Sequence, residues 1–402
     1  MKSALRLVSC FACGLVFHAG VSAEPKPAPS AEQTKAEGLV RALGDPSYKV
    51  REQAGHDLLQ LGRVAFPALQ QGLVDDNPEI RSRCRRLWPI IFEMDLQARL
   101  TNFLADTEGK QTHDLPGWSR FRKLVGDDRA ARELFAKMLR ADGTLLEQAE
   151  NRPDEFSPDR LVVRALQLQQ LANNPRANLK VSAGEGDYAL LLFLSANPKV
   201  QSTMAAAQQI GTVFYQPLLR QMLLSGDHVE VMRKLVIAWF EVNVEHSATV
   251  IHQMSYVATQ VGMKELAPLA LKVALRKEVA PFTRGTALTV VGRVGNKEQI
   301  AAIEPLLADN TVVTNFMVRQ GVVGPGGAAN NQVRTSQIGD VALAMTIHLS
   351  GQKPADFGYD MINTNPNAMF SAHYLGFVDD AARSDARRKW KEWVDKNKGE
   401  KK

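Results

Sequence analysis

A recurring pattern constrains the fold of this chain more than any other feature of its 402 residues. Apolar residues and one arginine occur at fixed steps in two neighbouring segments and once more far along the chain. The copies are Val50-Arg51-x-x-Ala54-x-x-x-Leu58-x-x-Leu61-Gly62, Ile80-Arg81-x-x-Cys84 and Thr283-Arg284-x-x-Ala287-x-x-x-Val291-x-x-Val294-Gly295. Internal similarity at such spacing is the signature of a stacked repeat architecture.

The steps within the pattern have a physical meaning. Apolar positions separated by four, four and three residues lie on one face of a helix. The small residue, Ala54 in the first copy, lets a neighbouring helix approach closely. Gly62 is expected to end the helix in a left-handed conformation. Each repeat is then a helical hairpin with an apolar face that only a neighbouring repeat can cover.

The arginines of the pattern predict a contact between repeats. Arg51 and Arg81 occupy equivalent positions, and polar turns that contain Asp45 and Asp76 precede them. We expect each arginine to pair with these carboxylates in a ladder that helps the repeats to stack. Arg284 occupies the same position in the third copy.

These residues resemble a known class of repeats. The resemblance is carried by Asp45-Pro46, Val50-Arg51, Ala54, Leu58, Leu61-Gly62, Pro67 and Leu69. They are similar to the short HEAT repeat of the phycobilisome-lyase-like class, and the first two copies resemble secreted bacterial HEAT-repeat proteins of unassigned function. The similarity covers residues 39–89 and 280–351. It implies an all-α solenoid of the HEAT or armadillo type with a binding role, and it supplies no catalytic residues.

The remaining segments are assigned from composition and spacing. We predict a signal peptide at 1–23, a proline-rich spacer at 24–30, HEAT repeats at 31–109, a divergent helical middle at 110–278, HEAT repeats at 279–377, and a basic terminal helix and tail at 378–402. In the middle region a helical stripe survives as Leu161, Ala165, Leu168 and Ala172. Trp390 and Trp393 are expected to share one face of the terminal helix.

An insertion interrupts the last repeat. The pattern should restart near Val313, but it resumes at Ile338. The residues between, near 314–337, are expected to form a loop or a small β-hairpin. Insertions in repeat arrays often lie on one functional face. We therefore take its glycines and asparagines as candidate partner contacts, namely Gly321, Gly324, Asn330 and Asn331.

The first 23 residues have the layout of a secretory signal. Lys2 and Arg6 precede an apolar run, and small residues up to Ala23 suit signal peptidase. Cleavage there predicts an exported protein, periplasmic or extracellular. Cys10 could instead belong to a lipoprotein box, although the main apolar run follows it. No later segment has the ~20 apolar residues that a membrane span requires.

The charge distribution argues against a body that binds nucleic acid. The formal net charge is +6, but residues 383–402 contain nine basic and four acidic side chains. The rest of the mature chain is therefore close to neutral, and a basic tail alone does not define a nucleic-acid-binding surface.

Several residues are candidates for chemistry. Cys84 could be a reactive thiol among arginines, but it occupies the packing position of Ala54, which favours a buried structural role. The spacing of histidines such as His56 and His113 does not match a metal site. We therefore expect neither a metal nor another cofactor.

The leading functional hypothesis is a non-enzymatic exported scaffold that binds a protein or peptide partner, which the sequence does not identify. A first alternative is binding of a polyanion by Arg81, Arg85 and the basic tail. A second alternative is an enzyme whose site lies in the divergent middle, residues 110–278.

Overall fold

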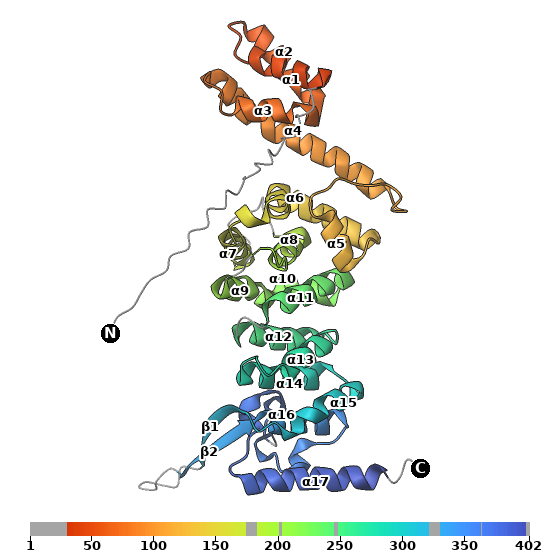
Figure 1. Ribbon diagram of the computed structural model, residues 1–402, viewed down its shortest axis with the longest axis vertical. Coiled ribbons are helices and arrows are strands. Elements are labelled where there is room, and N and C mark those ends of the chain that lie inside the picture. Colours follow the sequence, from red (N-terminus) through yellow and green to blue (C-terminus); the bar gives the residue numbers. More distant parts are fainter. Residues whose placement is uncertain are drawn as a thin grey trace, which may run out of the picture. The chain divides into compact units, whose positions relative to one another are not determined.

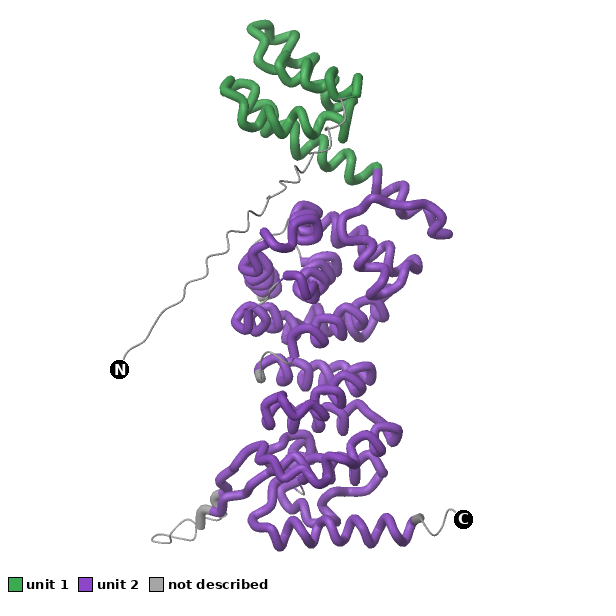
Figure 2. Tube along the Cα trace, viewed as in Figure 1, with its two compact units in different colours: residues 1–98 green, residues 99–402 purple. Residues whose placement is uncertain are grey.

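The computed structural model describes residues 30–173, 183–200, 203–244, 248–320, 330–362 and 364–398. This part of the chain is mostly helical and contains one two-stranded sheet, in agreement with the predicted helical class (Figure 1). The predicted signal peptide and most of the spacer, residues 1–29, lie outside it. The chain forms two compact units, residues 1–98 and 99–402 (Figure 2).

Unit 1 consists of paired helices. Its elements are α1 (Ala31–Ala42), α2 (Tyr48–Leu61), the 3-10 helix η1 (Gly62–Ala65), α3 (Phe66–Gly72) and the first part of α4 (Pro78–Ala105). Ser30 begins α1 with a capping box, in which its hydroxyl accepts a hydrogen bond from the Gln33 amide at 3.2 Å. The small positions of the pattern, Ala54 and Cys84, are buried together in the core of this unit.

Two details of the pattern differ from expectation. Val50 is 41% exposed, so the buried face of α2 begins at Ala54. Val50 is exposed because it lies in the first turn of α2, at the N-terminal end of the helix. Gly62 has the positive φ, 57°, that was predicted for it, whereas Gly295 has φ −80°. A Cβ at Gly295 would lie 2.4 Å from the Val291 carbonyl oxygen, so close approach explains that glycine.

Unit 2 begins with helices from the divergent middle. They are α5 (Trp118–Val125), α6 (Arg129–Asn151), the 3-10 helix η2 (Pro153–Glu155), α7 (Asp159–Asn173), α8 (Glu185–Ser195), α9 (Met204–Gly211), the 3-10 helix η3 (Thr212–Tyr215), α10 (Pro217–Leu224) and α11 (Val229–Asn243). Leu161, Ala165 and Leu168 are buried along α7, which confirms that part of the predicted helical stripe.

Successive helices then pack on one another toward the C-terminal end. They are α12 (Ala248–Val261), α13 (Leu266–Leu275), α14 (Pro281–Val294), the 3-10 helix η4 (Lys297–Gln299), α15 (Ile300–Ile303), the 3-10 helix η5 (Glu304–Ala308) and α16 (Ile338–Leu349). Both α12 and α13 contact α14, and α16 packs on α14 from another side (Figure 1). Ala287 is fully buried in α14. No helix among the described residues has the length and apolar character of a membrane span.

The predicted insertion is a β-hairpin. Strands β1 (Val312–Gln320) and β2 (Asn330–Gln337) are antiparallel, with Phe316 opposite Arg334 and Met317 opposite Val333. The hairpin therefore begins two residues before the predicted boundary. Helix α16 starts at Ile338, where the pattern was predicted to resume.

Short 3-10 helices and one long helix complete unit 2. They are η6 (Pro354–Phe357), η7 (Asp360–Ile362), η8 (Pro366–Phe370), η9 (Ala372–Tyr374) and α17 (Asp380–Lys398). Trp390 and Trp393 stack with their ring centroids 4.9 Å apart, and Trp390 also contacts Phe357. Both tryptophans thus lie on one face of α17, as predicted.

A buried ion pair attaches α17 to α16. Arg383 Nε donates to both carboxylate oxygens of Asp340, at 2.9 and 3.1 Å, and both residues are almost fully buried. Burial raises the pKa of Asp340, and the hydrogen bond from Arg383 opposes that shift. Each charge stabilises the other, because a single unpaired charge in the protein interior would raise the free energy of the folded state.

Replacing Arg383 should destabilise unit 2 strongly. We expect Arg383→Ala to lower the free energy of unfolding by about 3–5 kcal/mol, because it leaves the Asp340 carboxylate buried without its partner. The matched control is Arg388→Ala, which removes a more exposed arginine from the same helix and should cost about 0.5 kcal/mol or less. Guanidinium denaturation of both variants measures the difference. Equal losses would show that the buried pair contributes nothing special.

Candidate binding surface

The repeated arginines of unit 1 contact backbone carbonyl groups. Arg51 Nη1 donates to the carbonyl oxygens of Asp45 and Pro46 at 2.7 and 2.9 Å. Arg81 Nη1 does the same to Asp75 and Asp76, at 2.6 and 2.8 Å. The predicted pairing with the Asp45 and Asp76 carboxylates is therefore wrong. The guanidinium instead reaches the unpaired carbonyls of the preceding turn, within its own repeat.

Two arginines of unit 2 follow a related pattern. Arg284 Nε donates to the Ala274 carbonyl at the end of α13, at 2.9 Å, and Arg233 Nε donates to the Leu223 carbonyl at the end of α10, at 3.1 Å. In both cases the acceptor precedes the arginine by ten residues. The same spacing between arginine and acceptor therefore occurs in the divergent middle, at Arg233, and in the third copy of the sequence pattern, at Arg284.

The same arginines also bind acidic residues further along the chain. Arg284 pairs with Asp309 at 2.7 Å, Arg233 with Glu265 at 3.1 Å, and Arg51 with Glu79 at 3.4 Å. A ladder of ion pairs between successive segments therefore exists, but its acids are not those that the sequence suggested. The sequence could have indicated these ion pairs, because each acid follows its arginine by about the length of one repeat.

The predicted partner contacts in the insertion are only partly visible. Gly321 and Gly324 lie outside the described residues. Asn330 and Asn331 belong to β2, where they pair with Gln320 and Arg319 of β1. The asparagines therefore have a backbone role in the hairpin ladder.

The basic candidates are largely occupied by acidic or backbone partners. Arg81 binds the turn carbonyls, and Arg83 forms ion pairs with Glu79 and Glu52. Arg85 is exposed. In the terminal helix, Arg388 pairs with Asp385 and Glu392, in addition to the buried pair of Arg383. Part of the positive charge is thus balanced by nearby acids, while Arg85 is exposed and the terminal helix keeps an excess of basic residues.

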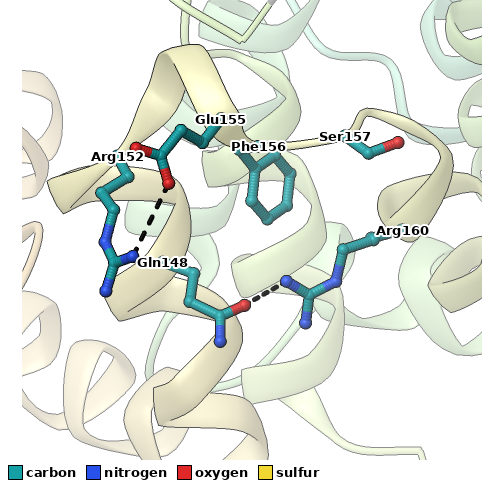
Figure 3. A pocket seen from close by; sticks show the side chains of 6 residues that line it. All are labelled: Gln148, Arg152, Glu155, Phe156, Ser157 and Arg160. Carbon is teal, nitrogen blue, oxygen red and sulfur yellow. Dashed lines mark hydrogen bonds and ion pairs between the residues drawn. The ribbon is translucent and has the colours of Figure 1, made fainter.

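Two adjoining recesses lie between α6 and α7 and share Arg160. Their volumes are about 200 and 300 Å³. In the smaller one, Arg160 bonds to Gln148, and Arg152 lies 3.6 Å from Glu155 (Figure 3). A serine nucleophile needs a base within hydrogen-bond reach. The Glu155 carboxylate points toward Arg152 and not toward Ser157 (Figure 3).

A buried histidine lies between two glutamates at the start of α11. His228 Nδ1 is 3.0 Å from Glu185, and Nε2 is 3.8 Å from Glu133. The carboxylates face opposite ring nitrogens, so they do not converge on one point that an ion could occupy. Among the described residues, no group of three or more His, Cys, Asp or Glu side chains is arranged to hold a metal ion.

Sequence reasoning missed a group of neighbouring, partly exposed aromatic side chains that we call the aromatic stripe. Its members come from five elements: Tyr215 of η3, His252 and Tyr256 of α12, Phe282 of α14, Phe316 of β1, and His373 and Tyr374 of η9. All seven are partly or largely exposed. Exposed aromatic residues in one contiguous area mark an interaction surface more often than scattered ones do.

The rings of the aromatic stripe are in contact with one another. Centroid distances are 4.8 Å for Tyr215 and Tyr256, 5.4 Å for His252 and Phe282, 6.0 Å for Phe282 and His373, 5.8 Å for His373 and Phe316, and 5.6 Å for Phe316 and Tyr374. His252 and Tyr256 are four residues apart on α12 and so share one helical face. The ring contacts thus form two groups, the Tyr215–Tyr256 pair and the series from His252 to Tyr374, and α12 contributes one member to each.

The aromatic stripe combines apolar ring surface with a few polar atoms. Partial burial lowers the pKa of His252, and the nearby His373 lowers it further. Burial raises the pKa of Tyr215, so its hydroxyl stays protonated and can donate a hydrogen bond. Such rings favour apolar or planar groups with occasional polar atoms, as extended peptides have.

Comparison of the chain with protein-family models, with curated proteins and with solved structures finds no match. The interpretation of this surface therefore rests on the geometry above.

The thiol of Cys84 should be unreactive in the folded protein. Burial raises its pKa to about 11, and its side chain is fully buried beside the Gly72 backbone. At pH 8 the thiolate fraction falls about a hundredfold relative to a thiol of ordinary pKa, and the reagent has no access.

The measurement is alkylation by iodoacetamide at pH 8, followed by mass spectrometry of the peptide that contains Cys84. Labelling should be slow in the native protein and rapid in denaturant, so it also reports unfolding of unit 1. Native labelling as fast as in denaturant would contradict the buried position.

Proposed function

We propose that this chain is an exported, non-enzymatic HEAT-repeat scaffold that binds a protein or peptide along its aromatic stripe. The observation that carries the proposal is the stripe itself, in which partly exposed aromatic side chains from five elements lie close together. Interaction surfaces are enriched in aromatic side chains, which provide large contact areas at a small entropic cost.

The repeat assignment is supported by the arginine contacts. Arg51, Arg233 and Arg284 each join the end of a preceding turn or helix to an acid further along the chain. In a solenoid, each repeat contacts its neighbours through equivalent positions. A guanidinium that binds on both sides is suited to that role.

A peptide suits the surface better than a polyanion does. Many arginines that could bind a polyanion are paired with acids. Polyanion binding depends on clustered unpaired cations that release counterions. Peptide binding instead uses aromatic and hydrogen-bonding contacts, which the stripe offers.

Export is supported by the first 23 residues and by cysteine usage. The basic start, apolar run and small residues before Glu24 form a signal-peptide pattern. Removal of this segment leaves Cys84 as the remaining cysteine of the sequence. An isolated buried thiol is compatible with an oxidising compartment, since it has no partner for a disulfide within the chain.

Removing one ring of the stripe should weaken peptide binding. We expect Tyr215→Ala to reduce the affinity for peptides selected from a displayed random library by about tenfold, the loss typical of an aromatic anchor. Tyr215 is 45% exposed, so the fold should tolerate the change. The control is Tyr48→Ala, which removes a more exposed tyrosine from unit 1, outside the stripe. Fluorescence anisotropy measures both, and equal affinities would count against the stripe.

Processing at Ala23 is a second test. When the full chain is produced in a bacterium with a secretory pathway, we expect the exported form to begin at Glu24. Ala23→Arg should block cleavage, because signal peptidase requires a small residue there, whereas Ser22→Ala should not. Mass spectrometry of the intact protein distinguishes the forms. Recovery of the unprocessed wild type in the cytoplasm would refute the export proposal.

A further inference from the structure

The two edges of the hairpin differ. The Thr335 amide donates to the Phe377 carbonyl at 3.0 Å, and the Phe377 amide donates back to Thr335 at 3.1 Å. Arg383 also donates to the Thr335 carbonyl, at 3.1 Å. The outer edge of β2 is thus covered at this position.

The outer edge of β1 has open hydrogen-bonding groups. Thr335 directs its backbone groups to Phe377, so its ladder partner Asn315 forms a non-hydrogen-bonded pair and points its own backbone groups away from β2. By alternation, Met317 points its groups the same way. Among the described residues, no backbone hydrogen bond joins β1 to an element other than β2. The Asn315 carbonyl has a 3.5 Å contact from the neighbouring Thr314 hydroxyl.

This edge has few of the features that normally protect an edge strand. The nine residues of β1 include no proline, lysine or acid; they include one arginine, Arg319, and an irregularity in pairing between Val312 and Thr314, away from Phe316 and Met317. Natural proteins usually place such residues on exposed edges to prevent pairing with other chains. The stretch around Met317, beside a partly exposed aromatic surface, is therefore suited to pairing with another strand.

The side chains on the two faces of β1 define what would pair with it. Phe316 lies on one face and belongs to the aromatic stripe. Met317 and its partner Val333 lie on the other face and are 61% and 50% exposed. A strand added beside β1 would place alternate side chains next to Phe316 and next to Met317. Apolar residues would be favoured at both sets of positions.

We propose that the free edge of β1 binds an extended peptide segment by strand addition. The backbone of the segment pairs with Asn315 and Met317, and its apolar side chains lie against Phe316 and the Met317–Val333 pair. This inference rests on the proposed function, because it specifies how a peptide held by the stripe is bound. Main-chain hydrogen bonds give affinity in this mode, and alternate side chains give specificity.

The test uses a fluorescent peptide of ten alternating valine and leucine residues with a lysine at each end for solubility, which presents apolar side chains to both faces of the added strand. We expect saturable binding to the full chain by fluorescence anisotropy. A version of the peptide with N-methyl groups on alternate backbone nitrogens should bind at least tenfold more weakly, because it cannot donate to an edge strand. Equal binding of both peptides, or no saturable binding of the first, would overturn the proposal.

A substitution in the protein, instead of a change in the peptide, tests the same edge of β1. Met317→Pro removes an outward amide without breaking the hydrogen bonds to β2, so the hairpin should persist while peptide affinity falls at least tenfold. The matched control is Met317→Ala, which removes the same side chain but keeps the outward amide, so its affinity should fall clearly less than that of Met317→Pro. Circular dichroism and thermal unfolding check that both variants fold.

The outcomes separate this inference from the proposed function. If Tyr256→Ala weakens peptide binding while Met317→Pro and N-methylation do not, strand addition is refuted and the aromatic stripe remains a peptide site. If neither change matters, the proposed function fails as well. If the wild type forms a dimer that Met317→Pro abolishes and the peptide does not compete with, the edge serves a second copy, and strand addition by a peptide is overturned.

Discussion

The arginine contacts at the ends of helices are the interaction on which the rest of this structure depends. Arg284 is the clearest case, because its guanidinium is almost fully buried between the Ala274 carbonyl and the Asp309 carboxylate. A charge in that position is tolerated only when it is paired and hydrogen bonded. The Arg284 side chain thereby donates a hydrogen bond to a carbonyl at the end of α13, and its contact with Asp309 holds the segment that leads into the hairpin.

Because these internal contacts hold the helices, outward residues are free to form a surface. Tyr256 and Phe282 belong to α12 and α14, and these helices are fixed by their packing on each other. Their rings can therefore remain partly exposed without loss of the core.

The regular part of the fold could be predicted from sequence, and the surface could not. Helix spacing located α16 at Ile338 and the buried stripe of α7, because one helical period relates nearby residues. The aromatic stripe joins Tyr215 to Tyr374, and no local period connects residues so far apart. The sequence predicts pairing of the arginines with the Asp45 and Asp76 carboxylates because it identifies charged side chains. It does not indicate which backbone carbonyl groups of a turn are within reach of a guanidinium.

The hairpin is an addition that the helices accommodate with little change. The Ile338 amide donates to the Thr311 carbonyl at 3.0 Å, and the Gly339 amide donates to the Asp309 carbonyl at 2.8 Å, so the two ends of the insertion meet at its base. Beyond that base, α16 packs on α14 closely enough that a Cβ at Gly292 would collide with the Met345 sulfur. Since helix packing continues past the insertion, the exposed positions of β1, such as Met317, are not needed to hold the helices together. An open strand edge can therefore persist there without weakening the helices that support it.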